Sequence, residues 1–110
     1  MRQWLLILGL AGCERWTKHD TALELSFVGT AALDWRQTVT ITGDCSEANP
    51  MIGPCGNRVP ANVYFPIAIV VHAVVAAALP RTWRTAFQAF TVGLEAGAIV
   101  HNTNAGYDAL

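Results

Sequence analysis

An uninterrupted apolar run over residues 62–79 limits the folds open to this chain more than any other feature of its sequence. A helix of that length, rising about 1.5 Å per residue, is just long enough to cross a hydrocarbon layer of about 30 Å. Tyr64 and Phe65, near its start, suit a membrane interface, and Pro66 is tolerated if it falls within the first helical turn. We therefore expect a helix that contacts either lipid or another apolar helix.

The first residues have the layout of a secretory signal. Arg2 precedes a short apolar stretch over residues 4–10, and two small residues stand directly before Cys13. Residues 10–13 resemble the bacterial lipobox, in which the cysteine thiol receives a diacylglycerol and the preceding segment is removed. The sequence thus predicts a lipoprotein-type signal over residues 1–12, lipidation at Cys13 and a single mature domain over residues 13–110. The alternative is an uncleaved anchor helix with a buried cysteine.

Composition limits the partners and the number of domains. A chain of 110 residues is long enough for one modest core. Lys and Arg total 7 against 8 Asp and Glu, so there is no basic stripe for phosphates, and nucleic acid is not an expected partner. No phosphate loop, hydrolase motif or Cys-x-x-Cys pair occurs, so we expect no enzyme, no cofactor and no metal.

The periodicity predicts an all-α fold, a small bundle of three helices whose last two form a hairpin in or on a membrane. The first and third helices would each open with a capping box, in which a threonine and a later Glu or Gln satisfy free backbone donors. The first helix would have an apolar side, containing Leu25 and Val39, and a polar side, containing Asp34 and Thr38. The expected helices are 21–42 (box Thr21–Glu24), 62–79 and 85–101 (box Thr85–Gln88).

A polar loop over residues 44–60 separates the first two helices, because turn-forming Asn-Pro and Gly-Pro pairs recur in it. It contains Cys45 and Cys55, and in an oxidising periplasm a disulfide between them would restrict the loop. The alternatives are two ordinary small apolar residues, or a zinc site, which would lack the nearby histidines needed to complete it. Glu47 is expected to cap a helix start or to meet Arg58.

Each predicted helix contains one ionisable residue in an otherwise apolar stretch: Asp34, His72 and Glu95. Such groups are costly inside a membrane unless they are paired, which makes each a candidate functional residue. One interpretation is a carboxylate–imidazole–carboxylate cluster that moves a proton or binds a divalent ion. The other is a hydrogen-bonded network that only sets the register of the helices, and this is the interpretation we favour.

From Asp34 onward the chain carries a combination of residues typical of a known group. An aspartate is followed four residues later by threonine at a helix end, and then by a Glu-x-Asn-Pro loop with a glycine. The residues are Asp34, Gln37, Thr38, Glu47, Asn49, Pro50 and Gly53. This combination resembles that of small, uncharacterised bacterial and prophage-encoded membrane proteins. The resemblance implies a helical membrane protein of no established activity, and it does not extend to the two cysteines.

These observations predict an accessory lipoprotein of the bacterial envelope, with a structural or interaction role and with the 44–60 loop on the periplasmic side. Its partners would be membrane lipid and either other envelope proteins or a second copy bound through Gly93 and Gly97, which have the spacing of closely packed membrane helices. The alternatives are an ion- or proton-handling membrane protein and a phage factor that acts on the host envelope.

The charges allow several arrangements of the chain. If Cys13 is lipidated outside, the first helix does not cross, and the other two form a hairpin with Arg81 and Arg84 inside. If Cys13 is not processed, Arg2 and Lys18 stay inside and all three helices can cross. A third arrangement is a water-soluble bundle tethered to the outer membrane.

Overall fold

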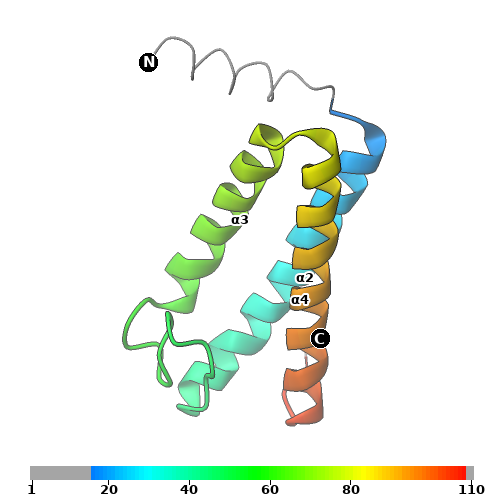
Figure 1. The fold of residues 1–110 in the computed structure, drawn as a ribbon. Helices are drawn as coiled ribbons and strands as arrows, with labels where there is room; N and C mark the ends of the chain where they lie inside the picture. The colour runs from blue at the N-terminus through cyan, green and yellow to red at the C-terminus, as the bar shows by residue number, and fades with distance from the viewer. Residues whose placement is uncertain (1–15, 109–110) are drawn as a thin grey trace, which may run out of the picture.

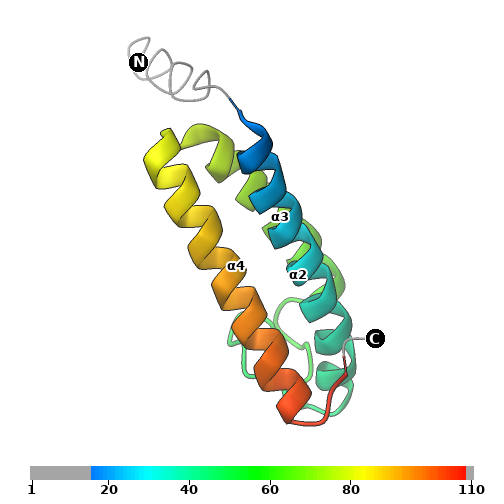
Figure 2. The same cartoon turned by 90° about the vertical axis from the view of Figure 1, so that its right-hand side faces the viewer.

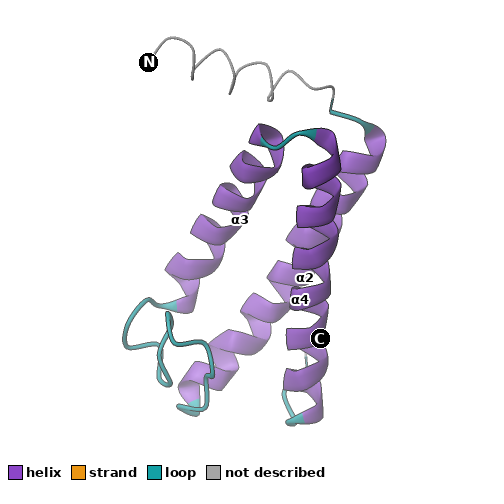
Figure 3. Ribbon diagram, in the orientation of Figure 1, coloured by secondary structure: helices purple, strands orange, loops and turns teal. Residues whose placement is uncertain are grey.

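The computed structural model describes residues 16–108, which form three helices: α2 (Lys18–Gly43), α3 (Ala61–Ala78) and α4 (Arg81–Asn104) (Figure 1). No strand occurs between residues 16 and 108, so the predicted all-α bundle of three helices is confirmed (Figure 3). The predicted signal over residues 1–12 and the predicted lipidation site Cys13 lie outside the described residues.

The helices α2 and α4 run parallel to each other, while α3 runs in the opposite direction (Figure 2). The first turns of α2 and α4 meet where Arg84 bonds Asp20, and their last turns meet where Gln37 bonds Thr103. We call the end of the bundle with the tight turn between α3 and α4 the turn end, and the opposite end, with residues 44–60, the loop end. The helices α3 and α4 meet at the turn end and diverge towards the loop end, and α4 makes most of its contacts with α2 (Figure 1).

The first helix begins earlier than predicted, because a different capping box is used. Thr17 is the N-cap: its side chain accepts a hydrogen bond from the Asp20 backbone N–H, while the Asp20 side chain accepts one from the Thr17 N–H. The expected box at Thr21 and Glu24 is wrong, since Glu24 lies inside the helix and contacts His72 instead. The short spacing from Thr17 to Asp20 satisfies the same two backbone donors one turn earlier.

The last helix also begins before its predicted capping box. It starts at Arg81, directly after Pro80, and no side chain caps it. The expected box at Thr85 and Gln88 is wrong, because Gln88 is fully buried and points towards α2. Proline is well suited to the position just before a helix, because its fixed backbone angle and missing N–H cost nothing there.

The helix α3 is the one described helix that is both long and apolar enough to cross a membrane. Its limits, Ala61–Ala78, agree within a residue with the predicted 62–79. Pro66 lies inside the helix, beyond the first turn to which we expected it to be confined. Only 22% of this segment is buried in the bundle, whereas a core helix of a water-soluble protein would be mostly buried.

Large apolar side chains gather on the outside of all three helices. On α2 the predicted apolar side is turned outward, with Leu25 and Val39 exposed, while Gln37 and Thr38 of the polar side are buried. The remaining exposed large apolar residues of the helices are Val63, Ile67, Val70, Val71, Val74 and Val75 on α3, and Trp83, Phe90, Leu94 and Val100 on α4. The bundle therefore departs from the usual distribution, because it buries polar and charged side chains beside a few apolar ones and leaves many large apolar side chains exposed.

The loop packs as a small core of its own at the loop end. Ile52 is buried against Ala61 and Phe65, with Trp35 and Tyr64 packed beside them. The Trp35 Nε1–H donates to Asn62 Oδ1 at 2.8 Å, which ties α2 to the start of α3. The predicted disulfide between Cys45 and Cys55 is present.

The Asn-Pro turn of the loop is held by its own side chains. The Asn49 carbonyl accepts hydrogen bonds from the N–H groups of Ile52 and Gly53, and its side-chain oxygen accepts one from Met51. Glu47 does not cap a helix or meet Arg58, as was expected; its Oε1 accepts the Asn49 N–H at 2.9 Å. Arg58 instead donates to the Pro50 carbonyl at 2.7 Å. The side chains of the predicted motif therefore shape this loop, as local hydrogen bonds to turn residues commonly do.

Replacement of Gly53 by alanine should destabilise the loop. Gly53 has a φ of 81°, and an added Cβ would collide with the Asn57 side-chain oxygen. We expect Gly53→Ala to lower stability by about 1–3 kcal/mol, measured as a fall in the midpoint of thermal unfolding. The control is Gly93→Ala, because Gly93 lies in α4 with open space around its Cβ position. That change should be neutral or stabilising by up to about 1 kcal/mol. Equal effects of the two substitutions would contradict this account of the loop.

Candidate functional site

The turn end of the interior is filled by a buried arginine. Arg84 is 0% exposed, and its Nη1 lies 3.0 Å from Asp20 Oδ2. Its Nε donates to the Ala76 carbonyl at 2.7 Å and its Nη2 to the Leu79 carbonyl at 3.2 Å. The guanidinium thus neutralises Asp20 and satisfies carbonyls at the end of α3, which have no partner within that helix. The Trp16 ring covers it, with its centroid 5.0 Å from Arg84 Cζ.

A fully buried glutamine continues the contact between α2 and α4. The Gln88 Nε2 donates to the Asp20 carbonyl and to Glu24 Oε1, each at 3.1 Å. Its two amide protons are therefore both used across the helix interface. Gln88 joins the ion pair at the turn end to the next group along the bundle.

His72 lies at the middle of the bundle and contacts both other helices. Its Nδ1 lies 2.8 Å from Glu24 Oε2 and its Nε2 lies 2.6 Å from Thr91 Oγ1. The imidazole is 5% exposed and stacks between the rings of Phe27 and Phe87, at centroid distances of 3.5 and 4.5 Å. Two aromatic faces and two polar partners hold this ring in one position.

Two carboxyl groups meet in the half of the bundle near the loop end. Glu95 of α4 hydrogen-bonds to Asp34 of α2 through their side chains. Asp34 Oδ1 also accepts from the Thr38 hydroxyl at 3.3 Å and from the Asn102 amide at 3.2 Å.

The last turns of α2 and α4 are joined by Gln37. Its Nε2 donates to Thr103 Oγ1 at 3.0 Å and to the Tyr107 carbonyl at 2.8 Å, while its Oε1 accepts from Asn102. The Tyr107 hydroxyl donates to Asp44 at 3.0 Å, which ties down the chain after α4. Gln37, a residue of the predicted motif, is therefore a structural link between two helices.

Together these residues form a line of polar groups along the α2–α4 interface, from the turn end to the loop end. We call this line the polar seam. Its members are Asp20, Glu24, Asp34, Gln37 and Thr38 from α2, His72 from α3, and Arg84, Gln88, Thr91, Glu95 and Asn102 from α4.

A cavity of about 240 Å³ opens off the seam at the loop end. We call it the acidic cavity, because Asp34, Glu47 and Glu95 line it together with Thr38 and Asn49. Four residues of the predicted motif, far apart in the sequence, thus share one space. Pro50 and Gly53 of that motif lie in the loop and do not line it.

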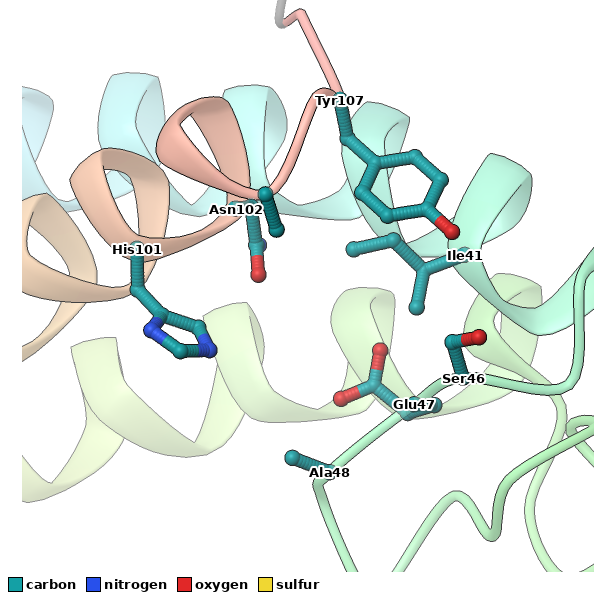
Figure 4. Close-up of a pocket in the computed structure, with 8 residues that line it drawn as sticks. Ile41, Ser46, Glu47, Ala48, His101, Asn102 and Tyr107 are labelled. Atoms are coloured by element: carbon teal, nitrogen blue, oxygen red, sulfur yellow. The ribbon is translucent and has the colours of Figure 1, made fainter.

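A second cavity, of about 250 Å³, lies between the end of α2, the loop and the end of α4 (Figure 4). Glu47 and His101 point into it from opposite sides, and Tyr107 lies at its edge (Figure 4). It shares Glu47, Ala48 and Asn102 with the acidic cavity, so the two cavities adjoin, and we call the second one the mouth of the acidic cavity. His101 is exposed there, as the sequence predicts for a residue near a helix end.

The structure brings together only part of the cluster expected from Asp34, His72 and Glu95. Asp34 and Glu95 are in contact, but His72 is held by Glu24 and Thr91, so the three do not form one carboxylate–imidazole–carboxylate group. Among the described residues there is no group of three His, Cys, Asp or Glu side chains that could hold a metal ion.

Sequence reasoning missed Asp20 and Arg84 as interior residues and gave Glu24 and Gln88 the wrong role. All four lie within the first turns of α2 or α4, where charged and polar residues are normally read as capping or solvated groups. The sequence does predict a polar stripe on one side of the last helix, because Gln88, Thr91, Glu95 and Asn102 recur at spacings of three, four and seven, and the structure turns this side towards the other helices.

Removal of one partner of the Asp20–Arg84 pair should be strongly destabilising, because it leaves a buried charge without a partner. We expect Arg84→Met to cost about 3–5 kcal/mol. The double variant Asp20→Asn with Arg84→Met should cost less than the sum of the single changes by about 0.5–3 kcal/mol. Equilibrium unfolding of the four proteins of this cycle measures the coupling. The control, Lys18→Met, changes an exposed cation in the same region and should alter stability by less than about 0.5 kcal/mol. Strict additivity would show that the pair is not coupled.

Comparison of the chain with protein-family models, with curated proteins and with solved structures finds no match.

Proposed function

We propose that this chain is an integral accessory protein of the bacterial envelope, in which α3 crosses a membrane and α2 and α4, too polar to cross alone, cross beside it with their polar side chains turned to the seam. In this proposal the apolar outer surface contacts lipid, the polar seam holds the helices in register, and the loop end faces the periplasm. Its role is structural or one of interaction with other envelope proteins. The observation that carries the proposal is the distribution of polarity, in which polar and charged side chains lie inside and many large apolar side chains are exposed.

A belt without exposed charge surrounds the bundle. No exposed Asp, Glu, Lys or Arg occurs on α2 between residues 21 and 35, on α3 over its whole length, or on α4 between residues 82 and 104. The exposed charges of the described helices lie beyond these limits, at Lys18, Arg36 and Arg81. In water a bundle of this size would instead expose its polar groups and bury its large apolar ones. In a hydrocarbon layer the observed arrangement is the favourable one, since ionisable groups there face the bundle interior.

The directions of the helices and the charges at the two ends support one orientation. Because α2 and α4 are parallel, the start of α2 and the α3–α4 turn lie on the same side of the membrane. That side carries the exposed cations Lys18 and Arg81, which favours the cytoplasm. The loop end carries the Cys45–Cys55 disulfide, which persists in an oxidising compartment, and this favours the periplasm.

This orientation conflicts with lipidation at Cys13. Cys13 precedes Lys18 by only a few residues in the sequence, and lipidation takes place on the outer side of the cytoplasmic membrane. If that side held the start of α2, the disulfide loop would lie in the cytoplasm. Lipidation at Cys13 is therefore compatible only with the other arrangement, in which the bundle is tethered outside the membrane. The crossing bundle requires that the N-terminal segment is neither lipidated nor removed.

A role in ion or proton handling is a second candidate, favoured by the Asp34–Glu95 carboxyl pair beside the acidic cavity. This geometry supports exchange of a proton or a cation between the carboxyl pair and the solution at the loop end. It does not support passage through the bundle, because Arg84 and Gln88 are fully buried and fill the interior at the turn end. No contact among the described residues favours a phage factor acting on the host envelope, and that alternative stays a prediction.

A charge placed in the belt tests the membrane location. Val70 is 62% exposed near the middle of α3. In lipid, Val70→Asp should cost about 3 kcal/mol of insertion free energy, whereas in water an exposed substitution of this kind costs less than about 0.5 kcal/mol. We expect wild type to remain in membranes after an alkaline carbonate wash and Val70→Asp to be largely lost from them. Met51→Asp, a matched change at an exposed position of the loop, should behave as wild type. A wild-type chain that is stable and monomeric in buffer without detergent would refute the proposal.

Labelling with a palmitate analogue, combined with a test of sidedness, separates the two arrangements. For the crossing bundle we expect no label on wild type or on Cys13→Ser, together with an active alkaline phosphatase fused after Asp108 and an inactive one fused after Arg81. Label that is present on wild type and lost from Cys13→Ser would support the tethered bundle instead.

A further inference from the structure

The acidic cavity adjoins a second, apolar space between α3 and α4. This space, which we call the apolar cleft, has a volume of about 340 Å³ and is lined mainly by side chains of α3 and α4. The two spaces share the lining residues Tyr64, Leu94 and Glu95, so they adjoin each other at Glu95. Each approaches the size of a small-molecule pocket, and together they have one polar and one apolar part.

The walls of the apolar cleft offer no hydrogen-bond partner over most of their area. Ala68, Val71 and Val75 line it from α3, and Phe87 and Leu94 line it from α4. Val71, Val75 and Leu94 are also exposed on the outer surface, so the cleft is open along the side of the bundle. An apolar chain lying in the cleft would be removed from water at a gain of about 25 cal/mol per Å² of buried surface.

Glu95 lies at the junction with one carboxyl oxygen unused. Its carboxyl group interacts with that of Asp34, and its Oε2 is buried and accepts no hydrogen bond from a donor of the described residues. A buried oxygen without a partner costs about 1–3 kcal/mol, which a ligand that donates a hydrogen bond would recover. Gln88 Oε1 of the seam also lacks a partner, but Gln88 lines neither space, so Glu95 is the group of the junction that can receive a ligand.

The charges that surround this junction select a cationic group. Asp34, Glu47 and Glu95 face the acidic cavity, and no lysine or arginine is among the residues that line it, its mouth or the apolar cleft. A phosphate or carboxylate headgroup would meet only like charge there, whereas an ammonium group would be attracted and would donate hydrogen bonds. The basic side chains among the lining residues are two histidines, His101 at the mouth and His72 at the apolar cleft.

We infer that the acidic cavity and the apolar cleft form one binding site for an amphipathic amine, with the ammonium group at Glu95 and the apolar chain between α3 and α4. The site follows from its own geometry and does not require the proposed membrane location. No covalent bond is made or broken in this site. The ligand is held by one charge-assisted hydrogen bond and by the burial of its apolar chain.

Saturable binding of tritiated dodecylamine to the full chain tests this inference. The chain is held in an uncharged detergent or, if it is soluble alone, in buffer, so that failure of the membrane proposal does not affect the measurement. Unlabelled dodecylamine should compete at least about tenfold better than dodecanol, because the charged hydrogen bond contributes about 1.5–3 kcal/mol. Dodecanoate should not compete. Equal competition by dodecanol, or better competition by dodecanoate, would overturn the assignment.

Two pairs of variants locate the site. Glu95→Gln should weaken dodecylamine binding about tenfold or more, while Asp108→Asn, the corresponding neutralisation at an exposed position outside the site, should change it by less than about twofold. Ala68→Phe fills the cleft and should also abolish saturable binding, and Ala77→Phe, at an exposed position of the same helix, should not. If circular dichroism shows that Glu95→Gln does not fold, the Ala68 and Ala77 pair decides. Wild-type affinity in Ala68→Phe would overturn the inference.

Discussion

The rest of the structure depends on the polar seam between α2 and α4. An arginine, four carboxylic acids and a histidine are withdrawn from water along this line, and each has a partner on another helix. Such groups are costly to bury alone, so any shift of one helix by a turn would separate several pairs at once. The seam therefore selects one register of three helices, although their apolar surfaces alone would permit many.

The same requirement explains how polarity is distributed in the bundle. The interior of such a short bundle has room for few side chains. Here polar groups take up much of that interior, so many large apolar side chains do not fit inside. The large apolar side chains are left outside, where they need a covering of their own. Small residues make this packing possible, since Ala31 and Ala76 are fully buried and allow the helices to approach closely enough for short hydrogen bonds.

Hydrogen-bond satisfaction is incomplete at two atoms of the seam, Gln88 Oε1 and Glu95 Oε2, and the second lies beside the acidic cavity. At His72 and Arg84, by contrast, donors and acceptors are matched over short distances. At Glu95 an oxygen is left over, and the neighbouring loop adds Glu47 instead of a cation. Departures from satisfied burial in an otherwise consistent structure are a sign of function, because they lower stability without helping the fold.

Much of this protein was determined by local patterns in its sequence. The helical periodicity, the turn-forming residues of the 44–60 loop and the spacing of Cys45 and Cys55 predicted the all-α fold, the loop and the disulfide, because each depends on neighbours in the chain. The sequence also identified Asp34, His72 and Glu95 as residues that need partners. Only the tertiary structure decided which partners they have, that Thr17 and not Thr21 caps α2, and that Asp20 and Arg84 are buried. These depend on which helix faces lie against each other, and that is set by groups more than 60 positions apart, as in the Asp20–Arg84 pair. A local pattern carries no information at that distance.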